Sequence, residues 1–126
     1  MNNEFNKVKE FQVIANQPIS EKPKMLDIER VNVRYRWMKE ELDEFVAAKD
    51  LVEQTDAMID LMYFALGTMV EMGVEPDSVF DIVHKANMSK LKNSRVLYDK
   101  NGKVRKSGNW HSPYHKIKRE IYKNSK

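Results

Sequence analysis

Two short segments of this 126-residue chain carry carboxylates at helical spacing. In the first, Glu40 and Glu44 are four residues apart and Glu41 and Glu44 are three apart; in the second, Asp56 and Asp60 are four apart. Residues three or four apart lie on one face of a helix. If both segments are helical, each therefore presents a group of carboxylates that can bind a cation, exchange protons or form a solvated acidic edge.

The second group lies on the most apolar run of the chain, Ala57 to Val70, which only Asp60 and Thr68 interrupt. A helix that is apolar all round is buried, either centrally or in an oligomer interface. A carboxylate there costs several kcal/mol unless it is protonated, paired or bound to a metal. The competing interpretation of the first group is a solvated acidic edge with Lys39 and Lys49 as partners. These two are the only basic residues between positions 37 and 84, so internal salt bridges cannot easily neutralise the acids of both groups. The sequence favours a divalent cation held by oxygens, Mg²⁺ or Mn²⁺.

Helical periodicity and punctuation predict the elements that position these acids. Asp27 is a suitable N-cap, Gly73 a suitable C-terminal residue, and Pro76 a suitable first-turn residue. We expect four helices, over residues 3–15, 27–49, 51–72 and 76–91. Their short connections predict an all-α fold, an antiparallel four-helix bundle. Two apolar stripes are expected to face its core: Phe5, Val8 and Phe11, and then Val31, Tyr35, Met38, Leu42, Phe45 and Val46.

The pattern changes after residue 91. The run Lys100-Asn101-Gly102-Lys103, with apolar residues on both sides, predicts a small β-hairpin over 95–106. A short last helix is expected over 113–124. We therefore expect one domain, 1–126, with a helical metal-binding body over 1–91 and a basic hairpin and tail over 92–126.

Charge is divided unevenly along the chain. Residues 1–89 contain 10 Lys and Arg against 17 Asp and Glu, whereas residues 90–126 contain 12 against 2. An acidic body with a basic tail suits a protein that holds cations and an anion. Nucleic acid is not an expected partner of the tail, because no DNA- or RNA-reading motif accompanies its basic residues.

Other features exclude whole classes of protein. The chain contains no cysteine, so it has no disulfide, thiolate metal site or cysteine nucleophile. Its first residues, MNNEFNKVKEF, lack the apolar core of a signal peptide, and a cytoplasmic location is expected. The apolar run of the third helix is shorter than the roughly 20 residues of a membrane span, so no membrane association is expected.

The acidic motifs resemble a known family. EELDE at 40–44 and D-x-x-x-D-L-x-Y at 56–63 resemble the all-α NTP pyrophosphohydrolase superfamily, which includes MazG, phosphoribosyl-ATP pyrophosphohydrolase and the dimeric dUTPases. VHKANMSKL at 83–91 and NGKVRKSGNW at 101–110 are similar to its MazG-like branch, and the resemblance covers roughly residues 5–113. The second motif of that family is usually E-x-x-D, but Ala57 stands three residues before Asp60. Either Asp56 takes that role or Glu53 pairs with Asp56 in a shifted register, which leaves the number of bound metal ions open.

The resemblance implies a metal-dependent enzyme that hydrolyses a nucleoside triphosphate, with dUTP or dCTP as leading substrates, to the monophosphate and pyrophosphate. It implies that Glu40 or Glu41, with Glu44 and Asp60 and with Asp56 in addition, ligates Mg²⁺ or Mn²⁺, and that the remaining glutamate acts as base or orients water. The altered second motif keeps an alternative open, a nucleotide-binding protein without turnover on the same scaffold.

The resemblance also suggests substrate contacts. Trp37 is a candidate for stacking on the base, and Tyr63 for reaching a phosphate. Asn87 is a candidate ligand or substrate contact, and Lys90, also a catalytic candidate, a phosphate clamp. The β and γ phosphates are assigned to the basic residues on or beside the predicted hairpin, Lys103, Arg105 and Lys106.

A homodimer or a dimer of dimers is expected. One helix of a four-helix monomer rarely has neighbours on every side, so part of the apolar surface between Met58 and Val70 would stay exposed. Pairing two copies covers it with an isologous contact. It also lets the basic tail of one subunit lie across the acidic site of the other.

Overall fold

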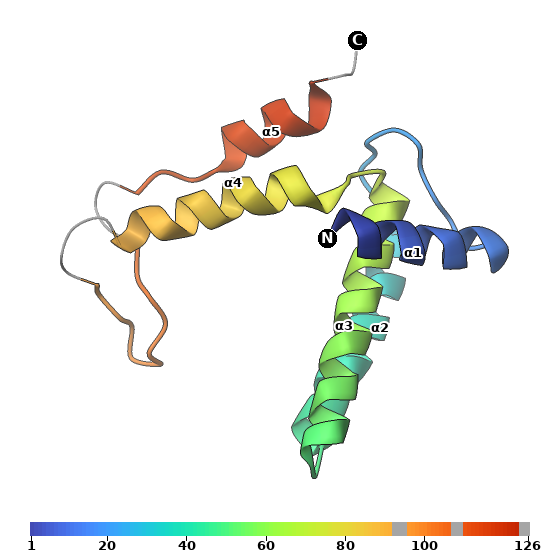
Figure 1. Ribbon diagram of the computed structural model, residues 1–126, viewed down its shortest axis with the longest axis horizontal. Coiled ribbons are helices and arrows are strands. Elements are labelled where there is room, and N and C mark those ends of the chain that lie inside the picture. The colour runs from blue at the N-terminus through green and yellow to red at the C-terminus, as the bar shows by residue number, and fades with distance from the viewer. Residues whose placement is uncertain (92–95, 107–109, 124–126) are drawn as a thin grey trace. The chain divides into compact units, whose positions relative to one another are not determined.

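The computed structural model describes residues 1–91, 96–106 and 110–123 (Figure 1). The described residues form five α-helices and one short 3₁₀ helix, and the predicted all-α class is confirmed. The chain divides into two compact units, Met1–Pro76 and Asp77–Lys126. The predicted single domain with a division after residue 91 stays a prediction. Parts of the predicted hairpin and tail, at 92–95, 107–109 and 124–126, lie outside the described residues.

The first unit contains α1 (Asn2–Ile14), α2 (Ile28–Ala47) and α3 (Leu51–Met72), each within about two residues of its predicted bounds. Asp27 caps α2, since its Oδ1 accepts a hydrogen bond from the Arg30 backbone N–H at 2.9 Å. Gly73 ends α3 in the left-handed region, with φ of 70°. Capping residues therefore fix the ends of the two helices that carry the acids.

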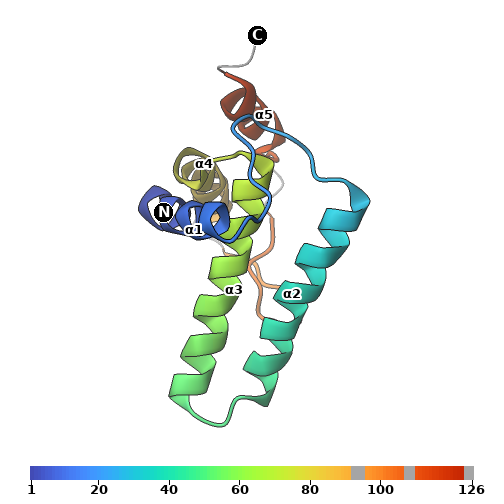
Figure 2. The same cartoon turned by 90° about the vertical axis from the view of Figure 1, so that its right-hand side faces the viewer.

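α2 and α3 form an antiparallel hairpin through a three-residue connection, and α1 lies against α3 (Figure 2). The core of this unit lies between α1 and α3. It consists of Phe5, Val8, Leu66 and Val70, with Met69 packed against them. Phe11, the third member of the predicted stripe on α1, is 54% exposed. Hydrophobic packing thus holds the C-terminal half of α3 to α1.

The apolar stripe predicted for α2 does not face α3. Its members Val31, Tyr35, Leu42, Phe45 and Val46 are exposed, and only Met38 is half-buried. The fully buried side chains of α2 are instead charged, Arg34 and Glu41. The prediction was wrong because a stripe defined by apolar residues alone ignores charged side chains that find partners across the interface.

α3 is only partly buried within the described part of the chain. Its second half contributes Leu66 and Val70 to the core, but Ile59 is 53% exposed and Met62 is 49% exposed. Among the described residues, no single helix is long and apolar enough to cross a membrane. Only the consecutive pair Leu51–Met72 and Pro76–Leu91, counted together, reaches that length and composition.

A buried ionic network links all three helices of the first unit. Glu71, near the end of α3, is 2% exposed. Arg30 donates two hydrogen bonds to its carboxylate, each at 2.9 Å, and Arg34 donates a third. Arg34 also donates to Gln12 of α1 at 3.1 Å. Burial alone would raise the pKa of Glu71, but the hydrogen bonds from the two arginines hold it below its ordinary value.

The second unit contains α4 (Pro76–Met88), the 3₁₀ helix η1 (Ser89–Leu91) and α5 (Tyr114–Tyr122). The predicted β-hairpin is not formed as two strands in the described residues. A single antiparallel bridge joins Tyr98 and Val104 around a turn in which Gly102 has φ of 81°. The Asn-Gly signal therefore located a turn correctly, but the single bridge that the described residues form does not make a sheet.

Replacing Glu71 with glutamine should destabilise the first unit by about 3 kcal/mol, because Arg34 would stay buried without its counter-charge. Urea unfolding followed by far-UV circular dichroism measures this. Asp43→Asn is the matched control: Asp43 pairs with Lys39 at 3.0 Å on the exposed side of α2, and its loss should cost less than about 1 kcal/mol. Equal losses in the two variants would contradict the importance of the buried pair.

Candidate metal centre

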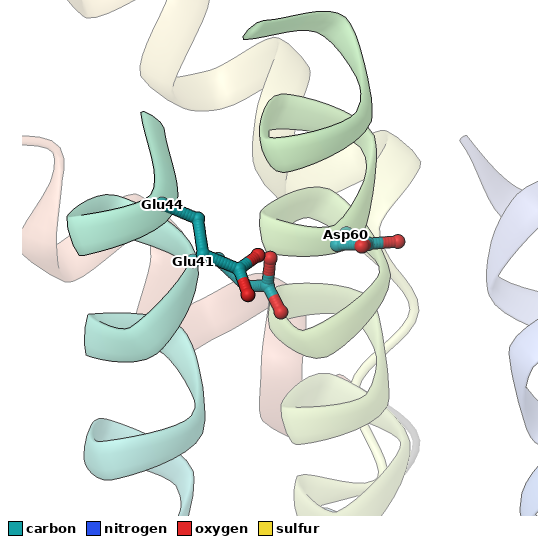
Figure 3. Close-up of side chains that lie close together, drawn as sticks. All are labelled: Glu41, Glu44 and Asp60. Carbon is teal, nitrogen blue, oxygen red and sulfur yellow. The ribbon is translucent and has the colours of Figure 1, made fainter. Parts of the chain in front are cut away.

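Three of the predicted ligands meet between α2 and α3. Glu41 and Glu44 project from α2, and Asp60 from α3 (Figure 3). One carboxylate oxygen from each lies within 4.8 Å of the other two. The i, i+3 spacing on α2 brings the two glutamates to one face, and the antiparallel hairpin brings Asp60 opposite them.

The electrostatics of this cluster oppose full ionisation. Glu41 is 9% exposed, and its pKa is raised to about 7 by burial, by a hydrogen bond with Glu44 and by the charges of Glu44, Asp60 and Asp56. Burial, Asp56 and Glu44 also raise the pKa of Asp60. At neutral pH, three carboxylates at this distance need a shared proton or a cation.

The donor set fits a divalent cation. Glu41 Oε2 is buried and has no hydrogen-bond partner within the described residues. An orphaned buried carboxylate oxygen is costly unless something binds it. The nearby acids make the local charge negative, and all-oxygen donors suit Mg²⁺ or Mn²⁺. The acidic cluster can therefore hold such an ion, with Glu41, Glu44 and Asp60 as its ligands.

The other predicted ligands are placed differently. Asp56 is exposed, but it lies near enough for its charge to raise the pKa of Glu41 and of Asp60. Glu40 and Glu53 are exposed and do not belong to the cluster that the described residues form. Both registers proposed for the second motif include Asp56, and the choice between Asp56 alone and Glu53 paired with Asp56 stays a prediction.

Two predicted substrate contacts lie in the first unit. Trp37 packs on Phe64 of α3, with ring centroids 5.7 Å apart. The guanidinium carbon of Arg34 lies 4.9 Å from the centroid of the same indole. Tyr63 is 39% exposed and makes an edge-to-face contact with Phe11 of α1 at 5.8 Å. Both rings are therefore fixed by protein neighbours, and their contact with substrate stays a prediction.

The remaining predicted contacts lie in the second unit. Asn87 is exposed on α4, and Lys103 and Arg105 are exposed at the turn. Lys90 and Lys106 lie over the indole of Trp110, with ammonium nitrogens 5.6 and 4.7 Å from the ring centroid. Trp110 is anchored to α4, because its Nε1 donates to the Ala86 carbonyl at 2.9 Å. Whether these cations reach the phosphates of a substrate stays a prediction.

The residues that support the cluster were not predicted, although the sequence contains a pattern that indicates them. Arg30, Arg34 and Glu41 are separated by four and seven residues, so they share one face of α2. Glu71 is an acid that directly follows the apolar run of α3, which ends at Val70. Pairing that acid with the arginines would have predicted which side of α2 faces α3.

A comparison with models of protein families shows the family to which this chain belongs. The model of the family described as phosphoribosyl-ATP pyrophosphohydrolase matches residues 8–87, well over half of the chain. This chain belongs to that family. It is therefore a member of the all-α NTP pyrophosphohydrolase, or MazG-like, superfamily, as the motifs predicted. The matched residues include Glu41, Glu44 and Asp60, but end before Lys90. A search of curated proteins found no match.

The raised pKa of Glu41 predicts how stability depends on pH in the metal-free protein. The folded state holds this proton more tightly than the unfolded chain, whose glutamate pKa is near 4.5. Protonated Glu41 therefore adds its full contribution to the free energy of unfolding below about pH 4.5. This contribution, on the order of 2 kcal/mol, is lost as the pH rises through about 7. Glu71, with its lowered pKa, acts with the opposite sign but only in more acidic solution.

Urea unfolding of metal-free protein at pH 5 and pH 8 measures this difference. Glu41→Gln should remove most of it, because glutamine mimics the protonated acid at both pH values. Glu40→Gln, an exposed neighbour, is the control and should keep it. An unchanged pH dependence in Glu41→Gln would show that Glu41 titrates normally.

Proposed function

We propose that this protein is a divalent-metal-dependent nucleotide pyrophosphohydrolase that cleaves between the α and β phosphorus atoms and releases a nucleoside monophosphate and pyrophosphate. The observation that carries the proposal is the meeting of Glu41, Glu44 and Asp60 between two helices of a chain that belongs to a pyrophosphohydrolase family. One oxygen of this group is buried and lacks a partner in the described residues, which is the chemistry expected of a cation ligand.

We assign Glu41, Glu44 and Asp60 to hold Mg²⁺ or Mn²⁺, with Asp56 close enough to add its charge. A bound divalent cation would offset the charge of the phosphate oxygens and make a water molecule easier to deprotonate. The cluster favours Glu41 as a ligand, which leaves Glu40 to receive the proton of the attacking water. Glu40 lies one turn before Glu44 on α2, and its exposed carboxylate is accessible to water.

The phosphates of the substrate require positive charge, and the basic residues of the second unit are the proposed source. Lys90 and Lys106 approach Trp110 together, so two ammonium groups are held on one anchored side chain. Among the described residues, neither forms a salt bridge at 4 Å or less. We propose that Lys90, Lys103, Arg105 and Lys106, with Asn87, contact the anionic part of the nucleotide.

The substrate class follows from the family and from the motifs. The family description makes phosphoribosyl-ATP a candidate substrate. dUTP and dCTP are the candidates that the resemblance to MazG-like enzymes suggests. All of them have an α–β phosphoanhydride bond, so the same group of carboxylates can serve each. Tyr63 is the proposed contact for the rest of the nucleotide, and base stacking on Trp37, the other predicted contact, competes with the role inferred for it below.

The alternative function is nucleotide binding without turnover. It is favoured by Ala57, which stands where the family motif has a carboxylate and is 2% exposed. A methyl group buried at this position supplies no oxygen to a cation. A site with fewer ligands can still bind a nucleotide and its cation without activating water.

We further propose that the protein forms a homodimer or a dimer of dimers in the cytoplasm. Apolar side chains are exposed along both helices of the α2–α3 hairpin, notably Leu42, Phe45, Ile59 and Met62. A second copy can cover such a surface with an isologous contact. Light scattering of the full chain distinguishes a dimer from a monomer of 14.9 kDa.

A pyrophosphate-release assay tests the proposed activity. The full chain should release pyrophosphate with Mg²⁺ or Mn²⁺ from at least one of phosphoribosyl-ATP, the NTPs and the dNTPs. Glu44→Gln and Asp60→Asn should each lower the rate at least about 100-fold, because direct ligands matter at least as much as their supporting residues. Asp43→Asn, an exposed acid beside Glu44, should change it less than about twofold.

Three outcomes separate the possibilities. Orthophosphate as the first product, or wild-type rates in both ligand variants, would refute the proposed reaction. Tight binding of a nucleotide without any product would favour the alternative. Pyrophosphate release that depends on Glu44 and Asp60 would support the enzyme.

A further inference from the structure

The indole of Trp37 lies one helical turn from the acidic cluster. Trp37 precedes Glu41 by four residues on α2, and Phe64 follows Asp60 by four residues on α3. The two rings meet across the helix pair with centroids 5.7 Å apart and planes inclined by 37°. The aromatic contact therefore spans the same two helices as the carboxylates, at the adjacent level of the hairpin.

Two arginines of α2 also hold the indole of Trp37 in place. The guanidinium carbons of Arg34 and Arg30 lie 4.9 and 5.6 Å from its centroid. Both arginines are hydrogen-bonded to the buried carboxylate of Glu71, and Arg34 also reaches Gln12. Cation–π contacts of this kind are stronger when the cation is desolvated, as Arg34 is at 3% exposure. Trp37 thus joins the ionic network to the helix pair.

In the described part of the chain, no apolar side chain of α2 is fully buried near the carboxylates, although Met38 of α2 and Leu61 of α3 are half-buried. Leu42 and Phe45, the apolar residues of α2 around Glu44, are exposed, and the buried residue of α3 at this level is Ala57. Repulsion among the acids favours separation of the helices. The contact between Trp37 and Phe64 opposes that separation directly beside the acids.

We infer that Trp37 is a positioning residue for the cation site, acting through its contact with Phe64 to hold Glu41 and Glu44 at binding distance from Asp60. This inference rests on the proposed function. It gives Trp37 a role different from stacking on a nucleotide base, because Arg34 and Phe64 already engage the indole. The two roles predict different measurements.

Mn²⁺ binding to the full chain without nucleotide, followed by the electron paramagnetic resonance of the free ion, tests the inference. Trp37→Leu should weaken Mn²⁺ affinity about tenfold or more, in the range seen when a residue that orients metal ligands is lost. Trp37→Phe, which retains an aromatic ring, should stay within about threefold of wild type. Phe64→Leu should weaken binding as Trp37→Leu does, and it leaves the Arg34–Glu71 pair in place.

Val8→Ala is the matched control, because Val8 is 2% exposed in the core between α1 and α3, a cluster to which none of the three acids belongs. It should lower stability without changing Mn²⁺ affinity. If Trp37→Leu and Phe64→Leu both bind Mn²⁺ as wild type does, the inference is overturned while the cation site stands. A rise in KM for the nucleotide with unchanged Mn²⁺ affinity would overturn it in favour of base stacking. Failure of the wild-type protein to bind Mn²⁺ would overturn the proposed function and the inference together.

Discussion

The first unit depends on buried charge between α2 and α3. α2 turns Arg34 and Glu41, rather than its apolar residues, toward α3. Near the end of α3, Glu71 compensates Arg34 and Arg30 with three hydrogen bonds. Near the middle of α3, Glu41 meets Glu44 and Asp60, and the described residues supply this group with no compensating cation. The face of α2 that meets α3 therefore carries Arg34, whose charge is neutralised by Glu71, and Glu41, whose charge has no compensating cation among the described residues.

The ion pairs near the end of α3 and the carboxylates near its middle have different consequences. A buried ion pair contributes little net stability compared with apolar packing, but breaking it is costly, so it fixes how the helices meet. Gly67 shows how closely the network fits: a Cβ there would clash with the Gln12 amide oxygen and lie 2.9 Å from Arg34 Nη1. The ion pairs that Glu71 forms with Arg30 and Arg34 set the rotation of α2 about its axis. That rotation places Glu41 and Glu44 opposite Asp60.

The sequence predicted the helices and the central acids well. Asp27 and Gly73 act as the caps that their residue types suggested, and the spacing of Glu41, Glu44 and Asp60 placed them on facing surfaces. The rotation of α2 could not be predicted from apolar periodicity, because Leu42 and Phe45 define a stripe that this unit leaves exposed. The predicted β-hairpin is not supported in the described residues for a related reason: Asn101-Gly102 determines a turn locally, whereas strands need partners that the local sequence does not specify. The supporting residues Arg34, Glu71 and Gln12 come from three helices, and only their arrangement in space reveals the network.

The central claim is that the carboxylates between α2 and α3 exist to hold a divalent cation. The melting temperature of the full chain with and without Mg²⁺ tests it most directly, because an ion that binds only the folded state stabilises it by ~2.7 kcal/mol at a hundredfold excess over Kd. We expect millimolar Mg²⁺ to raise the melting temperature of the wild-type protein, EDTA to reverse the rise, and Asp60→Asn to abolish it. A wild-type melting temperature that is the same in Mg²⁺ and in EDTA would contradict the account and leave these acids as a solvated face.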